Sequence, residues 1–415
     1  MLKKIVSFFP AYLFGSFPLL IFTGPFLPDL ASVILGIFFL YICFKKKRLK
    51  YYFYNKIVGV IILLNCLLLL SSFFSDYTKY SLSTSIFYFR HLLFALAISY
   101  ILKNYKSALN YFNITLYLCL LIGSIDCYVQ FLFGKNLIGL ESNNNYRLGS
   151  FFGEELIIGS YLARLFPFYL AIITLSSRDK KYQIVDIIIF VLIGGAIYLS
   201  GERTAFALYL LSCSFFILYN NAKLSFKIFT PLIILIVVLN ILFPKIYLKQ
   251  IEHTKNQIFQ ENRITFFSSD HEGLYESAYK MFLNKPLLGQ GPRTFRLLCD
   301  KDNFQIIKPD AQSCSSHPHN TYFQLLAEVG FIFFSIVLFI FIFVSYYLAL
   351  MILDVVKSNH KKNVSYYYLV AIFINFFPFI PSGNFFNNWI NILYYLPVGF
   401  VFYFYSNKFF KKNVN

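Results

Sequence analysis

The chain is dominated by apolar runs of about 20 residues, and these runs restrict what it can fold into. A run of that length is what an α-helix needs to cross the hydrocarbon core of a membrane. A transmembrane β-barrel is excluded, because its strands alternate apolar and polar side chains at every second residue. The sequence therefore predicts an all-α fold: a polytopic bundle of transmembrane helices.

We predict about twelve spans from the length of the apolar runs. They lie at residues 8–24, 26–44, 57–75, 82–102, 109–133, 156–176, 184–200, 203–219, 226–244, 321–350, 365–381 and 388–406. Together they form one membrane domain over residues 1–415, with one large outer loop at 245–320 before the last three spans. Within this loop we expect a helix with Asp270 as its N-cap. Its apolar face would comprise Leu274, Ala278, Met281 and Phe282.

Composition excludes the main soluble classes. Hydrophobic residues make up 58% of the chain and charged residues only 13%, against about 25% charged in a soluble domain. A soluble enzyme, a disordered protein and a nucleic-acid binder are therefore excluded. The net charge of +18 indicates membrane topology and contact with anionic lipids.

The distribution of Lys and Arg predicts the orientation. With the N-terminus inside, the inner segments hold 21 basic residues and the short outer loops hold 4. The 10 basic residues of the 245–320 loop carry little information, because long loops translocate largely regardless of charge. Both termini are thus predicted to be cytoplasmic.

The strongest chemical signal is the run Ser316-His317-Pro318-His319-Asn320, where the large loop meets a span. A histidine there can take a proton from a sugar hydroxyl at neutral pH. The alternative is a polar helix start, with Asn320 as the cap and the histidines at the level of the lipid headgroups.

Arginines supply a second signal. Arg203 follows Ser200-Gly201-Glu202 in a short outer turn and begins a helix, so its guanidinium lies beside unpaired backbone N–H groups. That combination suits phosphate, although an arginine anchored at the interface is the alternative. Arg147 and Arg293 are further candidates outside the spans.

Four ionisable residues are predicted at one depth, roughly 10–12 Å below the outer face at 1.5 Å per helical residue. Charged groups at such depth usually face a partner or a wet cavity, so they predict a charged layer under an outward pocket. The alternative is structural pairing without chemistry. The residues are Arg90, Asp126, Arg164 and Glu328.

Cys299 and Cys314 lie in the outer loop and are predicted to form a disulfide if that compartment is oxidising. Zinc is disfavoured, because the spacing lacks a Cys-x-x-Cys pair. Asp300 and Asp302 have the spacing of metal-binding Asp-x-Asp motifs, but such a pair is frequent by chance. We expect no metal and no cofactor.

These motifs resemble the O-antigen ligase and O-antigen polymerase family of bacterial envelope glycan transferases. His319-Asn320 followed by nine residues and Gly330 fits the membrane signature of that family. The turn Ser200-Gly201-Glu202-Arg203 resembles its Ser-Gly-x-Arg turn, and Gly289-Gln290-Gly291-Pro292 its segment before the histidines.

The resemblance implies an inverting, metal-independent glycosyltransferase at the periplasmic face of the bacterial inner membrane. The donor would be a glycan on undecaprenyl diphosphate, and the acceptor lipid A–core in a ligase. His319 would be the catalytic base, Arg203 and Arg293 would bind the diphosphate, and His317 and Arg147 would be second-rank site residues.

Three alternatives remain open. A polymerase would use a second lipid-linked glycan as acceptor, and a protein O-glycosyltransferase would use Ser or Thr. A non-enzymatic flippase for lipid-linked oligosaccharides would need charges at mid-depth and a cavity reachable from both faces. The outward position of the charged layer and of the large loop favours a fixed outer active site instead.

Overall fold

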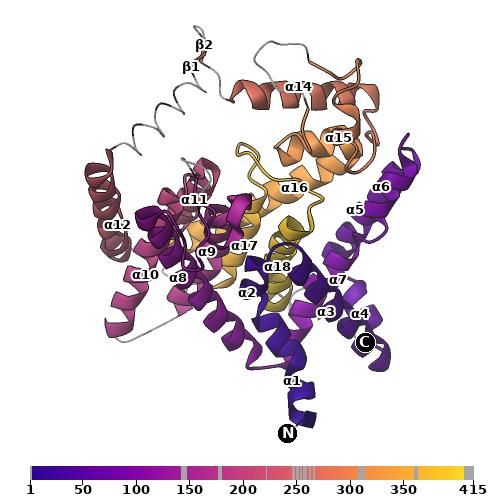
Figure 1. Ribbon diagram of the computed structural model, residues 1–415. Helices are drawn as coiled ribbons and strands as arrows, with labels where there is room; N and C mark the ends of the chain where they lie inside the picture. Colours follow the sequence, from indigo (N-terminus) through magenta and orange to yellow (C-terminus); the bar gives the residue numbers. More distant parts are fainter. Residues whose placement is uncertain are drawn as a thin grey trace. The chain divides into compact units, whose positions relative to one another are not determined.

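The computed structural model describes residues 2–141, 147–175, 180–220, 222–244, 267–306, 314–358 and 363–405. It also describes a few positions between 248 and 264. The rest of 245–266, with residues 307–313 of the predicted outer loop and 406–415 of the predicted cytoplasmic end, lies outside the described residues. Figure 1 labels the helices and strands.

The chain divides into two compact units, each assembled from separate stretches of sequence. Unit 1 comprises Met1–Ala31, Ile101–Glu252 and Val344–Asn375. Unit 2 comprises Ser32–Tyr100, His253–Phe343 and Phe376–Asn415.

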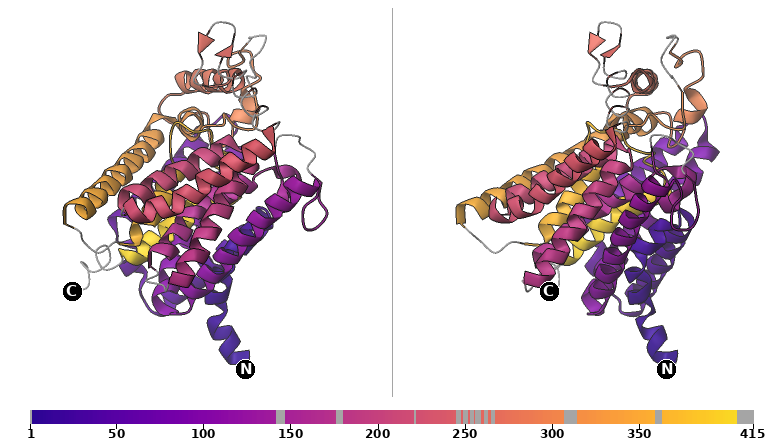
Figure 2. Two further views of the ribbon diagram at one scale, coloured as in Figure 1. Left: turned by 90° about the vertical axis from the view of Figure 1, so that its left-hand side faces the viewer. Right: turned by 60° about the vertical axis from the view of Figure 1, so that its left-hand side comes forward.

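Unit 1 is built around α9 (Ile158–Leu175), which packs against four other helices. Nearly every side chain of α9 from Tyr161 to Ile172 is buried, as expected for a helix that is apolar on all sides. In Figure 2, α10 lies alongside α12 in both views. The other elements of the unit are α1 (Leu2–Gly15), α2 (Phe17–Phe22), α8 (Ala108–Phe133), η1 (Ser150–Glu155), α10 (Lys180–Leu199), α11 (Arg203–Tyr219), α12 (Ala222–Leu242) and α17 (Ser365–Asn375).

Unit 2 combines apolar helices with the described part of the predicted outer loop. It holds α4 (Leu49–Phe53), α5 (Lys56–Phe73), α6 (Thr78–Ser85), α14 (Ser269–Asn284), α15 (Phe295–Leu298) and α18 (Asn388–Phe404). It also holds most of α3 (Phe26–Lys45) and α7 (Arg90–Asn104) and the first part of α16 (Thr321–Ser358). The short strands β1 (Phe259–Gln260) and β2 (Arg263–Ile264) pair antiparallel.

The expected helix in the outer loop is present as α14, but its N-cap is Ser268 and not Asp270. The Ser268 hydroxyl accepts a hydrogen bond from the backbone N–H of His271, which satisfies a free donor of the first turn. Leu274, Ala278 and Met281 of the predicted apolar face pack into a buried cluster with α15 and the start of α16, whereas Phe282 is only partly buried. The members of the cluster are Leu274, Ala278, Met281, Phe295, Leu298, Cys299, Phe304 and Ala327.

The segment 286–291 packs against α16 at a break in the helix at Gly330. Gly330 has φ 79°, and a Cβ at this position would lie 2.4 Å from the carbonyl carbon of Leu287. The backbone N–H groups of Gln290 and Gly291 donate to the carbonyl oxygens of Ala327 and Glu328, at 3.0 and 2.8 Å. Only glycine permits this approach, which explains the glycine of the His319…Gly330 motif.

The prediction of a helical membrane protein is confirmed, and every predicted span overlaps a helix. Among the described residues, five helical segments are long and apolar enough to cross a membrane, and further apolar helices are shorter. The number of spans therefore stays a prediction. The five are Phe26–Lys45, Lys56–Phe73, Thr78–Asn104, Ala108–Phe133 and Thr321–Val356.

One predicted boundary is wrong. The helix predicted at 365–381 ends at Asn375, because Pro378 and Pro381 disfavour helical backbone in the residues before them. The span predicted at 82–102 lies within the candidate span Thr78–Asn104, in which α6 ends at Ser85 and α7 begins at Arg90.

Candidate functional site

The histidine segment of unit 2 lies between the disulfide and the first turn of α16. Asn320 caps that helix: its Oδ1 accepts from the N–H groups of Tyr322 and Phe323, at 2.9 and 3.2 Å. Its Nδ2 donates to the carbonyl oxygen of Pro378 at 2.9 Å. These hydrogen bonds of Asn320 fix the position of His319 just before the start of α16.

His317 has both ring nitrogens engaged. Its Nε2 lies 3.3 Å from the carbonyl oxygen of Ser382, which can only accept, so this nitrogen carries the hydrogen. Its Nδ1 then accepts from the hydroxyl of Ser316 at 2.8 Å. Burial, followed by the nearby charge of His319, lowers the pKa of His317 to about 3. His317 is thus neutral and held in one tautomer.

His319 differs from His317 in the hydrogen bonding of its ring. Its backbone has φ 54°, and its carbonyl oxygen accepts from the N–H of Ser382 at 2.8 Å. Within the described part of the chain, neither ring nitrogen of His319 has a hydrogen-bond partner. Burial, and then the charge of His271, lowers the pKa of His319 below its ordinary value. A neutral imidazole with an available lone pair is what a general base requires at pH 7.

A third histidine, His271 of α14, was not predicted as a site residue. Its ring centroid lies 5.8 Å from that of His319, and its Nδ1 lies 2.9 Å from the Ser268 hydroxyl. Tyr275, one turn later, stacks on Phe323 of α16, with the ring centroids 4.5 Å apart and the ring planes inclined by 3°. The sequence signal was His271 and Tyr275 at helical spacing, but nothing in it placed this face beside the histidine run.

The segment 376–387, between α17 and α18, was also missed, because residues 376–381 were assigned to a span and residues 382–387 were given no role. Ser382 contacts the histidine segment three times, through His317, through His319 and through a 2.8 Å hydroxyl pair with Thr321. The available signal was the turn-forming run Pro381-Ser382-Gly383-Asn384.

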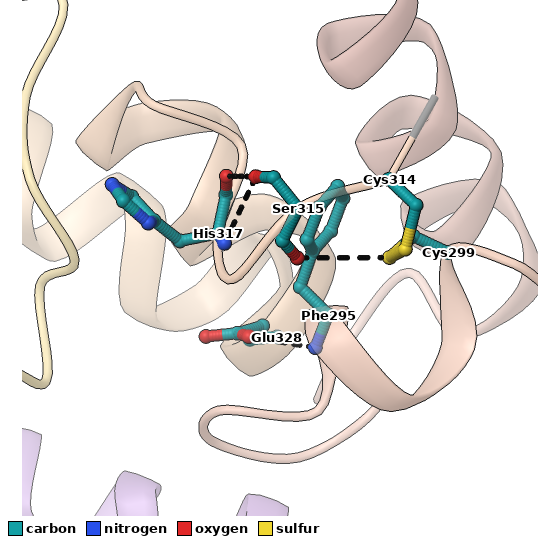
Figure 3. Close-up of a disulfide and its surroundings, with 6 residues drawn as sticks. All are labelled: Phe295, Cys299, Cys314, Ser315, His317 and Glu328. Carbon is teal, nitrogen blue, oxygen red and sulfur yellow. Dashed lines mark hydrogen bonds between the residues drawn. A yellow bond between two sulfur atoms is a disulfide. The ribbon is translucent and has the colours of Figure 1, made fainter. Parts of the chain in front are cut away.

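Glu328 connects α16 to α15. Its fully buried carboxylate accepts from the backbone N–H of Phe295 at 2.8 Å and from Nε2 of Gln324 at 2.9 Å. Figure 3 shows Glu328 beside the backbone nitrogen of Phe295. The carboxylate thus orients the short helix that carries Arg296, whose charge acts on His317.

Arg293 precedes α15 in unit 2. Its backbone has φ 65°, and its guanidinium carbon lies 5.8 Å from the ring centre of Tyr80. The Nε atoms of Arg293 and Arg296 are buried, and among the described residues neither has a hydrogen-bond partner.

Cys299 and Cys314 form a disulfide, with their Cα atoms 5.0 Å apart (Figure 3). The bond joins α15 to the start of the histidine segment, where the Ser315 hydroxyl donates to the carbonyl oxygen of His317. A carboxylate oxygen of Asp300 lies within 4.8 Å of both sulfurs. Neither sulfur is a thiolate in the disulfide, so this group is not a metal site in that state.

The candidate arginines of unit 1 surround the turn between α10 and α11. Arg203 is the first residue of α11 and is exposed. Arg147 donates from Nη2 to the carbonyl oxygen of Leu156 at 2.7 Å and lies 3.5 Å from Oε2 of Glu202.

The other predicted charged residues each contact polar groups within their own unit. Asp126 accepts from the N–H of Leu137 at 2.7 Å and from the hydroxyl of Ser150. Arg164 donates to Oδ1 of Asn375. Arg90 donates to Oδ1 of Asn388 and to the carbonyl oxygen of Phe87, at 2.9 Å each.

Residues 188–338 match the family model described as O-antigen ligase. This part of the chain is similar to the O-antigen ligase family. The match confirms the resemblance, and it includes Arg203, Arg293, His317, His319 and Glu328. It covers a little more than a third of the chain and leaves out Arg147, Arg90, Asp126 and Arg164. No curated protein matches the chain significantly. The family is one of glycosyltransferase-like membrane enzymes that act on lipid-linked glycans.

Proposed function

We propose that the protein transfers a glycan from undecaprenyl diphosphate to lipid A–core at the periplasmic face of the bacterial inner membrane. The observation that carries this proposal is the contrast between His317 and His319 inside the family-matched segment. One ring is fixed at both nitrogens, and the neighbouring ring is neutral and unengaged among the described residues.

In this reaction a ring nitrogen of His319 takes the proton of the acceptor hydroxyl. The acceptor oxygen attacks the anomeric carbon of the donor glycan and forms the new glycosidic bond. The bond from that carbon to the phosphate oxygen breaks, and the undecaprenyl diphosphate leaves with the electron pair. Attack from the face opposite the leaving group inverts the anomeric centre.

Negative charge develops on the diphosphate as it leaves, and fixed cations stabilise that charge. Arg203 and Arg293 are the residues proposed to bind the diphosphate, with Arg147 in support. A guanidinium offers a planar pair of donors that fits phosphate oxygens, so no divalent cation is required. Transfer that persists in EDTA would support this assignment, and its loss in EDTA would contradict it.

The identity of the acceptor separates a ligase from a polymerase. Purified protein is incubated with the lipid-linked donor, with and without lipid A–core, and the products are separated by mass. A product on lipid A–core is expected. Longer lipid-linked glycans in its absence would instead make the protein a polymerase, and a glycosylated Ser or Thr a protein glycosyltransferase.

A flippase would be recognised by a different result. In a deletion strain it would leave lipid-linked units on the cytoplasmic face, whereas a transferase would leave them on the periplasmic face. The proposed orientation, with both termini cytoplasmic, is tested by cysteines introduced near 258 and 411. An impermeant reagent should label only the first in intact cells, and labelling of the second would overturn the topology.

A further inference from the structure

We propose that Glu202 is a positioning residue for Arg147 in the donor site, an inference that rests on the proposed function. Glu202 is the variable residue of the Ser-Gly-x-Arg turn, and sequence reasoning gave it no role. Its side chain is 5% exposed, yet it is a carboxylate surrounded by groups that favour its charge.

The carboxylate lies at the N-terminus of α9, on a different helix from its own. Its Oε1 accepts from the N–H groups of Gly159 and Ser160, at 2.7 and 3.3 Å, and its Oε2 accepts from the Ser160 hydroxyl at 2.9 Å. These N–H groups have no partner within their helix, and the helix dipole favours an anion there. Burial raises the pKa of Glu202, while Arg147 and these hydrogen bonds oppose the rise.

The approach of Glu202 to α9 requires a glycine. A Cβ at position 159 would lie 2.9 Å from Oε1 of Glu202 and 2.4 Å from the hydroxyl of Ser200. The turn and the helix start are therefore in direct contact, and the carboxylate has little freedom to move. A fixed carboxylate can fix the cation beside it.

Arg147 is held on two sides. Its Nη2 donates to the carbonyl oxygen of Leu156 and lies 3.5 Å from Oε2 of Glu202. Leu148 donates its N–H to the carbonyl oxygen of Ser200 at 3.1 Å, so the backbone beside Arg147 is attached to the turn that carries Glu202. Arg147 also interacts electrostatically with Arg203. Glu202 offsets the repulsion of the two cations and holds the guanidinium of Arg147 near the start of α11.

The experiment measures the donor KM and kcat of purified protein with a lipid-linked donor. Glu202→Gln removes the charge, and we expect the donor KM to rise about tenfold with a smaller change in kcat, which is about 1.4 kcal/mol of binding. Glu202→Asp retains the charge and should recover part of the affinity. Glu155→Gln, an exposed carboxylate of the same unit, is the control and should leave KM unchanged.

A double-mutant cycle separates positioning from helix capping. If Glu202 acts through Arg147, Glu202→Gln should change the donor KM less than about twofold in an Arg147→Ala background. An equal effect in both backgrounds would overturn the inference, as would a wild-type KM for Glu202→Gln with only a lower melting temperature. Those results would leave the proposed function intact, because they bear on the role of Glu202 alone, whereas wild-type transfer by His319→Ala would contradict the proposed function itself.

Discussion

The imidazole rings of His317 and His319 lie with their centroids 4.1 Å apart and their planes inclined by 46°. The first ring bonds through both nitrogens to Ser316 and Ser382, whereas the second is unengaged within the described residues. Two histidines separated by one residue thus lie in different environments. His317 supports the segment, and His319 is the one suited to accept a proton.

The pKa of His319 predicts the acid limb of the pH profile. Burial and the charge of His271 lower this pKa below about 6.5, the ordinary value for histidine. The neutral form is the base, so kcat/KM should be constant near pH 7 and fall as the pH drops through the lowered value. His271→Gln removes the repelling charge and should move the acid limb to higher pH. Tyr279→Phe, an exposed change on the same helix, should leave the limb in place. An unmoved limb in His271→Gln would contradict this account.

Arg203 is predicted to act on donor binding and on chemistry together. Arg203→Ala should raise the donor KM and lower kcat, because the same cation binds the diphosphate and stabilises its developing charge. Arg203→Lys should recover only part of both, since lysine lacks the planar pair of donors. Lys135→Ala, an exposed cation of the same unit, is the control for a general loss of positive charge. Steady-state kinetics with a lipid-linked donor measure both constants, and equal effects of the two alanine variants would argue against a specific role.

Gly330→Ala should destabilise the protein by roughly 2–4 kcal/mol, because the new Cβ would collide with backbone in an already left-handed conformation. Gly59→Ala in α5 is a matched control: its Cβ would meet no atom within 4 Å. Alanine in a helix interior should there stabilise by about 0.5–1 kcal/mol. Thermal unfolding in detergent compares the two variants. Equal melting temperatures would show that segment 286–291 does not depend on the glycine.

The disulfide between Cys299 and Cys314 is predicted to form in the native envelope. Closing a loop of 15 residues stabilises the folded protein against unfolding by roughly 3 kcal/mol in the chain-entropy model. Cys299→Ser should therefore lower the melting temperature and also the transfer rate, because the bond attaches the histidine segment to α15. Cys66→Ser, at an exposed free cysteine, should do neither. Mass mapping without reductant should find one linked peptide pair, and two free thiols would refute the prediction.

The positions of the helices were readable from the sequence, because apolar runs near the length of a span leave few other structures possible. The helix start at Asn320 and the face of α14 followed from capping and periodicity. The early end of α17 did not, because the apolar run continues past Asn375 through the prolines.

The site was only partly predictable. The histidines and arginines were found by residue type and motif, but the contacts of Glu202 and Ser382 depend on segments far apart in the chain. Glu328 was singled out by its predicted depth and by its place in the run that resembles the family pattern. Its bond to the backbone of Phe295 depends on how the segment 286–298 meets the break in α16, which no local pattern specifies.

The central claim is that His319 is the base, and transfer by purified protein with EDTA present tests it most directly. The comparison is between His319→Ala and its neighbour His317→Ala, with melting temperatures measured for both. The account predicts that His319→Ala lowers the rate by about 10²–10⁴ at near-normal donor KM, since the proton acceptor is lost and the arginines remain. His317→Ala should have a milder effect on rate. Wild-type turnover by His319→Ala would contradict the account.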